Sequence, residues 1–84
     1  MTEEQIREHE KADEAEAMIE MARYVRNIRE RVGMTQSEFA ERLCISLDTL
    51  RNWEQGRRYP GGAAKALLRI IERSPEAALN ALKE

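Results

Sequence analysis

The sequence has little of the chemistry on which many small proteins depend. It contains one cysteine, one histidine, one tryptophan, one phenylalanine and two tyrosines among 84 residues. A single cysteine, Cys44, excludes an intrachain disulfide and a cysteine-cluster metal site. A single histidine, His9, excludes a histidine-rich zinc site, and we expect it to be inert. Without a nucleophile–base pair or a glycine-rich phosphate loop, we expect neither an enzyme nor a bound cofactor.

Long apolar runs are also absent. No run approaches the roughly 18 residues of a membrane span, so we expect no membrane partner. The first residues, Met1-Thr2-Glu3-Glu4, are acidic and lack the apolar stretch of a secretory signal. These features favour a cytoplasmic protein.

The net charge of −2 has the wrong sign for a nucleic-acid partner, but it is unevenly spread. Residues 1–20 carry eight acidic and two basic side chains, a net charge of −6. Residues 21–84 carry twelve basic and eight acidic side chains, a net charge of +4. This asymmetry predicts an acidic extension (1–20) and a basic domain (21–84) with different partners. A merely solubilising extension is the alternative.

The first half of the chain is predicted to be one long helix. No glycine or proline precedes Gly33, which would end the helix as a left-handed cap at about residue 32. Apolar residues recur there at helical spacing: Met18, Met21, Ala22, Val25, Ile28 and Val32. Upstream, the one large apolar residue is Ile6, so we expect residues 1–15 to fray or to become ordered on a partner.

Four further helices follow from their start signals and apolar spacing. Thr35 and Glu38 have the spacing of a capping box, and Ser46 is a second N-cap. Ser74 before Pro75 is predicted to be a third N-cap. The helices cover residues 36–43, 47 to about 55, the amphipathic segment 64–71, and 76–82. The sequence contains no credible strand, which predicts an all-α fold of five helices.

The second and third helices, separated by a short turn, form a candidate helix-turn-helix. Ala40 supplies the small residue required where the two helices cross. Large apolar residues close the wedge: Phe39, Leu43, Ile45, Leu50 and Trp53. The turn usually carries glycine, whereas this chain has Cys44, at a cost of about 1 kcal/mol if the position is left-handed. We interpret Cys44 as a small packed thiol.

Residues 28–60 resemble the Cro/C1-type (XRE) helix-turn-helix family. The runs TLRNWEQGRRYP (49–60) and ALLRIIERSPEA (66–77) are similar to its HigA-type antitoxin branch. The resemblance covers residues 23–83, with a small departure at 60–63, which read Pro-Gly-Gly-Ala where the branch often has Pro-x-Gly-Pro. It implies a five-helix, lambda repressor-like DNA-binding domain with an acidic helical extension.

The resemblance implies that the second helix of the pair enters the major groove. The three-residue spacing between Leu50 and Trp53 places both on the inward face of this helix. We therefore interpret Trp53 as a core residue and not as a platform for base stacking. Arg51 can bind guanine or phosphate and Asn52 can pair with adenine. Asp48 can accept from cytosine or only support the helix N-terminus, and Leu47 can touch a thymine methyl group. The residues expected to face outward are Leu47, Asp48, Arg51, Asn52 and Gln55.

Other residues are expected to hold the DNA backbone or the fold. Gln36 resembles the phosphate-binding glutamine of the family, and Ser46, Thr49, Arg57 and Arg58 complete the candidate DNA-binding set. The alternative for each of them is an ordinary exposed polar side chain. Arg29 and Glu54 resemble a family pair that forms a partly buried salt bridge and orients the recognition helix.

The function that the resemblance implies is that of a homodimeric antitoxin. It would repress its own operon at double-stranded operator DNA and neutralise a basic, RelE/HigB-like toxin. A −6 extension suits a basic protein partner. One alternative is a stand-alone repressor of the same family. Another is a protein-interaction adaptor that does not bind DNA. The outward pair Arg51 and Asn52, together with Arg57 and Arg58, argues against the adaptor. The dimer surface is the last helix, with Leu79 and Leu82, or the helix around Met18 and Met21.

Overall fold

A computed structural model describes residues 3–83 of the chain, and its side chains from Glu14 onward. The described residues form five helices: α1 (Glu3–Arg31), α2 (Gln36–Leu43), α3 (Leu47–Glu54), α4 (Gly62–Arg73) and α5 (Pro75–Ala81). Residues 3–83 contain no strand, which confirms the predicted all-α, five-helix fold. None of the helices in this range is both long and apolar enough to cross a membrane. The side chain of His9 lies outside the described part.

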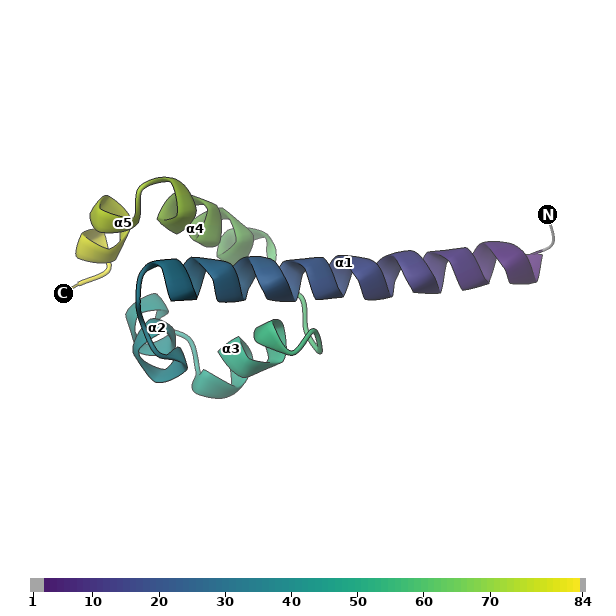
Figure 1. Ribbon diagram of the computed structural model, residues 1–84, viewed down its shortest axis with the longest axis horizontal. Coiled ribbons are helices and arrows are strands. Elements are labelled where there is room, and N and C mark those ends of the chain that lie inside the picture. The colour runs from purple at the N-terminus through teal and green to yellow at the C-terminus, as the bar shows by residue number, and fades with distance from the viewer. Residues whose placement is uncertain (1–2, 84) are drawn as a thin grey trace.

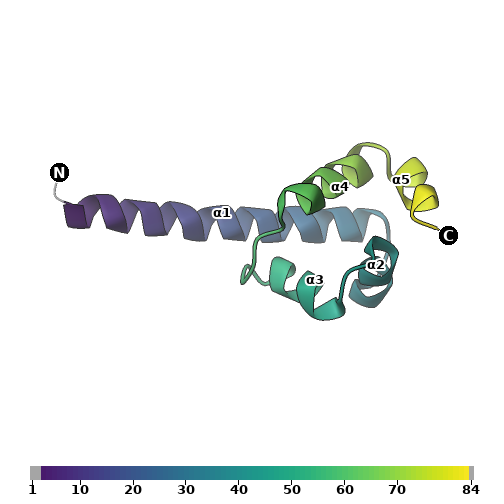
Figure 2. The same ribbon diagram turned by 180° about the vertical axis from the view of Figure 1, so that it is seen from behind.

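Helix α1 runs through the middle of the molecule. Figure 1 shows α4 and α5 on one side of it and α2 and α3 on the other, and Figure 2 shows the same arrangement from behind. α1 packs against both α3 and α4, while α2 packs against α3 and α5 against α4. The N-terminal half of α1 extends beyond the other helices, which gives the molecule dimensions of 54 × 23 × 19 Å. The boundary predicted at residue 20 therefore lies within a continuous helix.

The core joins α1 to all four shorter helices. Its largest fully buried side chains come from α1, α2, α3 and α4: Val25, Phe39, Leu50, Leu68 and Ile71. Burial of each of these stabilises the fold by about 1.5–3 kcal/mol. On α1, the buried residues Ala22, Val25 and Ile28 follow the apolar spacing that the sequence predicts. Since Leu50 and Trp53 belong to the same core, the inward face of α3 is fixed.

Two of the three predicted N-caps make the expected side-chain hydrogen bonds. The Glu38 amide donates to Thr35 Oγ1 (3.1 Å) and the Thr35 amide donates to Glu38 Oε1 (3.2 Å), so the capping box is complete. These hydrogen bonds with Thr35, the backbone one above all, lower the pKa of Glu38. At α3, the Thr49 amide donates to Ser46 Oγ (3.0 Å).

Ser74 stands at the predicted N-cap position of α5, but it does not cap the helix as a serine N-cap usually does. Its side chain makes no cap hydrogen bond, and its φ and ψ of −139° and 67° are not those of an N-cap. Ser74 is also the C-cap of α4, where its amide donates to the Ile70 carbonyl (2.8 Å), so α4 sets its backbone. α5 begins one residue earlier than predicted, at Pro75, whose fixed φ suits the first helical position.

The turn between α2 and α3 depends on a left-handed residue. Cys44 has φ 60° and ψ 39°, and it is the one non-glycine with positive φ among residues 3–83. The position is therefore left-handed, which is the case in which replacing the usual glycine by cysteine costs about 1 kcal/mol. The expectation of a packed thiol is wrong, because Cys44 is exposed. The residue closes α2 through its amide, which leaves its side chain outside the core.

We predict that Cys44→Gly raises the free energy of unfolding by about 1 kcal/mol, because glycine has no Cβ to strain the left-handed backbone. For a domain of this size, the midpoint of thermal unfolding should rise by about 4–8 °C. Circular dichroism melts would measure it. Cys44→Ala is the matched control: it keeps the Cβ and should change stability by less than about 0.5 kcal/mol. Equal midpoints for the glycine and alanine variants would contradict the assignment of strain.

Candidate nucleic-acid interface

The pair α2–α3 has the geometry of a helix-turn-helix. At the crossing of the two helices, Ala40 is 2% exposed, and its carbonyl accepts from the Ile45 amide (3.0 Å) across the turn. Phe39 and Leu50 are fully buried on either side, and Ile45 packs against them in part. A larger residue at position 40 would push the helices apart, so the small side chain sets their approach.

Helix α3 has one buried and one exposed face. Leu50 and Trp53 point into the core, with exposed fractions of 0% and 7%. Of the residues predicted to face outward, three are exposed: Asp48, Arg51 and Gln55. The other two, Leu47 and Asn52, are half-buried, since they lie at the edges of the outer face. Together these five side chains form the solvent side of α3.

The turn after α3 carries two basic side chains, Arg57 and Arg58, beside this face. The Asn52 carbonyl accepts from the amides of Arg57 (2.9 Å) and Arg58 (3.3 Å), and both side chains are exposed. Gly56 makes the turn possible with φ 71°. At the other end of α3, the hydroxyls of Ser46 and Thr49 lie 2.8 Å apart. The predicted phosphate contacts on α3 and its turn thus flank both ends of the helix.

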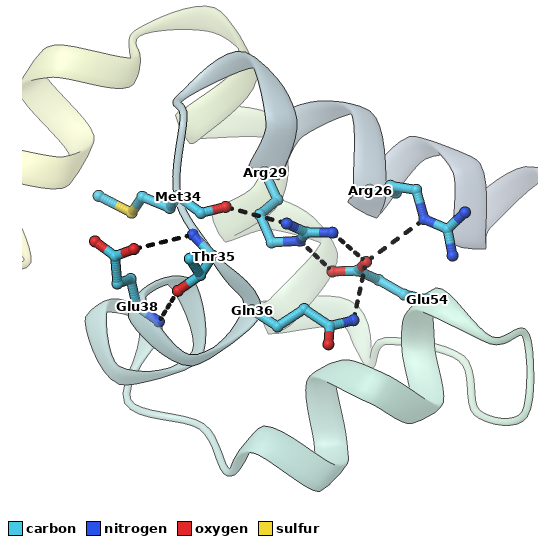
Figure 3. A network of polar contacts seen from close by, with 7 residues as sticks. All are labelled: Arg26, Arg29, Met34, Thr35, Gln36, Glu38 and Glu54. Carbon is cyan, nitrogen blue, oxygen red and sulfur yellow. Dashed lines mark hydrogen bonds and ion pairs between the residues drawn. The ribbon is translucent and has the colours of Figure 1, made fainter.

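A buried carboxylate fixes the C-terminal end of α3. The side chain of Glu54 has no exposed surface, and Figure 3 shows the donors gathered around it. Arg29 on α1 donates through Nε to Oε2 (2.8 Å) and through Nη2 to Oε1 (2.9 Å), a bidentate pair. The hydrogen bonds to Glu54 are the main cause that raises the pKa of Arg29, so the guanidinium stays charged.

Arg29 also links α3 to the turn before α2. Its Nη1 donates to the carbonyl of Met34 (3.1 Å), one residue before the Thr35 cap. One guanidinium therefore joins α1, the α1–α2 turn and the end of α3. The ion pair that the resemblance implied is present.

Gln36 belongs to the same network. It is half-buried at the first turn of α2, and its Nε2 lies 3.3 Å from Glu54 Oε1. The amide group carries two N–H donors, so the bond to Glu54 leaves one for another acceptor. The structure thus holds Gln36 in place from the side of α3, at the helix N-terminus where the sequence predicts a phosphate contact.

The sequence reasoning missed Arg26. Its Nε lies 3.6 Å from Glu54 Oε1, and its side chain is 54% exposed. Arg26 precedes Arg29 by three residues on α1, so the two share a helix face, and this spacing was the available signal. The contact adds a second positive charge beside the buried carboxylate, close to the exposed face of the molecule.

Residues 20–82 match the helix-turn-helix domain family. The chain belongs to this family. The chain is therefore a helix-turn-helix DNA-binding domain. The predicted family resemblance is therefore confirmed.

Among curated proteins, the chain is similar to Antitoxin HigA-2 of Vibrio cholerae serotype O1. The two are 48% identical over 50 residues, which are 60% of this chain and 48% of the relative. The chain thus matches about half the length of that protein. No solved structure matches the chain.

We predict that Glu54→Gln lowers the free energy of unfolding by about 3–5 kcal/mol, because it leaves the guanidinium of Arg29 without its charged partner. Arg26→Gln removes an exposed pair with the same carboxylate and should cost at most about 1 kcal/mol. Urea unfolding followed by circular dichroism measures both. If Glu54→Gln does not fold, the double variant Arg29→Met/Glu54→Leu should recover stability, since it removes both charges. Equal losses from the Glu54 and Arg26 variants would refute a dominant role for the buried pair.

Proposed function

We propose that the chain is a sequence-specific transcription regulator that reads operator DNA with α3. The observation that carries the proposal is the division of this helix. Its inner face is anchored by Leu50, Trp53 and Glu54, while its outer face offers Arg51 and Gln55 to solvent. A rigid helix with polar side chains on one face is what direct reading of base edges requires. The regulator is proposed to be cytoplasmic and not an enzyme.

The outer face of α3 offers different chemistry to different bases. Arg51 can donate two hydrogen bonds to O6 and N7 of guanine, and Asn52 can bond to N6 and N7 of adenine. Asp48 can accept from N4 of cytosine, while Leu47 suits the methyl group of thymine. Arg51 and Gln55 are four residues apart, so they lie on neighbouring turns and can reach successive base pairs.

Contacts with phosphates would set the register of the protein on DNA. Arg57 and Arg58 supply charge at one end of α3, and the hydroxyls of the N-cap Ser46 and of Thr49 in the first turn lie at the other. Gln36 offers a side-chain donor at the N-terminus of α2, where backbone amides also point at an anion. These contacts fix position and not sequence.

We further propose that the chain is an antitoxin of a toxin–antitoxin operon. The support is the 48% identity to Antitoxin HigA-2 and the segregation of charge between residues 1–20 and 21–84. A dimer would repress its own operon at an inverted repeat, with half-sites about one helical turn apart. Its acidic extension would bind a basic, RelE/HigB-like toxin. A stand-alone repressor remains the second candidate, because the helix-turn-helix alone serves both.

We expect the double variant Arg51→Ala/Asn52→Ala to lose at least about 10-fold in affinity for the inverted repeat of its own promoter, because each bidentate base contact contributes about 1–3 kcal/mol. Fluorescence anisotropy with labelled duplex measures it. The comparison variant is Arg58→Ala, which should weaken specific and random DNA alike and reduce the salt slope by about 1. If the double variant binds its promoter like the wild type, α3 does not read the bases as proposed.

Neutralisation of a toxin is expected to depend on the acidic extension. The variant Glu3→Gln/Glu4→Gln/Glu8→Gln/Glu10→Gln removes four negative charges and should no longer rescue growth of cells expressing the small basic protein encoded beside this gene. Its affinity for promoter DNA should not fall. Full rescue by this variant would place the toxin surface on the domain, and the absence of such a neighbouring gene would favour the stand-alone repressor.

A further inference from the structure

A groove lies between α1 and α4, on the side of α1 away from the recognition helix. It has a volume of about 300 Å³ and is lined by Met21, Tyr24, Lys65, Arg69, Glu72 and Arg73. Because α3 and α4 pack on opposite sides of α1, DNA held by α3 leaves this groove free. We call it the α1–α4 groove.

The α1–α4 groove is basic, with exposed apolar residues beside it. Three of its side chains are cationic and one is acidic, over a floor of the half-buried Met21 and Tyr24. Burial, with Glu72 nearby, raises the pKa of Tyr24, which keeps the phenol neutral. Lys65 Nζ lies 4.9 Å from the ring centroid of Tyr59, which is 41% exposed, and Ile70 on α4 is 55% exposed. Such a surface fits an acidic segment that carries some apolar residues.

The chain itself contains a segment of that kind. Residues 1–20 have a net charge of −6, and the described part of them exposes Glu14, Glu16 and Glu20. Ile19, in the same stretch, is 51% exposed. α1 is continuous from Glu3 to Arg31, and its own residues Met21 and Tyr24 line the groove. A straight helix cannot turn back onto its own side, so the extension of a chain cannot reach the groove of that same chain, and an acidic segment in the groove would come from another molecule.

The distribution of charge along α1 favours a second copy of the chain as that molecule. Acidic residues dominate up to Glu20, whereas the part from Met21 to Arg31 carries four arginines and one glutamate. The basic side chains of the α1–α4 groove lie beside this positively charged half of α1 and add to its charge. A surface that changes sign about one point is complementary to itself when turned by a two-fold axis through that point, which is the requirement for a symmetric dimer.

We propose that two copies of the chain pair through antiparallel α1 helices that cross near Glu20 and Met21. The acidic extension of each copy lies in the α1–α4 groove of the other. Glu16 and Glu20 of one protomer face the groove bases of its partner. The inference deepens the proposed function, because it assigns the surface of the dimer that the regulator requires.

The test measures dimerisation of the full chain without DNA, by sedimentation velocity, with circular dichroism to confirm folding. The extension variant Glu16→Arg/Glu20→Arg and the groove variant Arg69→Glu/Arg73→Glu should each raise the dimer dissociation constant by about 100-fold or more, since every reversed contact occurs twice. The wild-type dimer should weaken as salt rises.

Recovery of dimerisation when the charge reversals are combined separates a direct contact between the extension and the groove from a general effect of net charge. The chain with all four reversals should dimerise again. An equimolar mixture of the extension variant with the groove variant should form a heterodimer although neither variant pairs with itself, because only the mixed pair has opposite charges in both grooves. Without rescue in either experiment, the proposed pairing is wrong.

Lys83→Glu is the matched control at the far end of the molecule, beside Leu82. It should leave the dissociation constant unchanged. Loss of the dimer in this variant, with no effect of the groove variant, would assign the interface to α5 and overturn the proposal. A monomeric wild-type chain would overturn it as well and leave the groove to an acidic protein partner. Both outcomes leave the reading of DNA by α3 intact, because that is measured separately with the Arg51 and Asn52 variant.

Discussion

The burial of one carboxylate governs how the helix-turn-helix is held. Glu54 ends α3 with its charge fully removed from water, which is tolerated because Arg29 meets it with two hydrogen bonds. Its donors come from separate elements, Arg29 from α1 and Gln36 from α2. The geometry of these bonds is specific, whereas apolar packing alone would permit small rotations of α3. The ion pair therefore orients α3 more than it adds to net stability.

The same helix that supplies Arg29 also carries the acidic extension. The C-terminal half of α1 packs against α3 on one side and α4 on the other, and its N-terminal half continues beyond the domain. Where the two halves meet, Gly56 of the turn after α3 lies beside the backbone of Met18. A partner bound to the extension would thus act on a helix that touches the DNA-reading unit directly. In the proposed dimer, a basic toxin would have to take the extension from the groove of the second copy.

Local patterns predicted most of the fold. The capping box at Thr35 and Glu38, the left-handed Gly33 and the apolar spacing of α1 are all present, since each depends on residues within one or two helical turns. Ser74 does not make the predicted side-chain cap because it is the junction between α4 and α5, and the end of α4 sets its backbone. The exposure of Cys44 was also missed, because the residue type favours burial while its position in the turn does not.

By itself, the sequence determined the five helices, the inward face of α3 and the separation of negative from positive charge along the chain. It also carried the family resemblance, because the helix-turn-helix has local steric demands that Ala40, Leu50 and Trp53 meet. Only the tertiary structure decided which distant groups meet. Arg29 and Gln36 reach Glu54 across 25 and 18 residues, and the bases of α4 lie beside Met21 and Tyr24 of α1. Such contacts depend on how whole helices pack, and helical periodicity carries no information about the partner that a face will find.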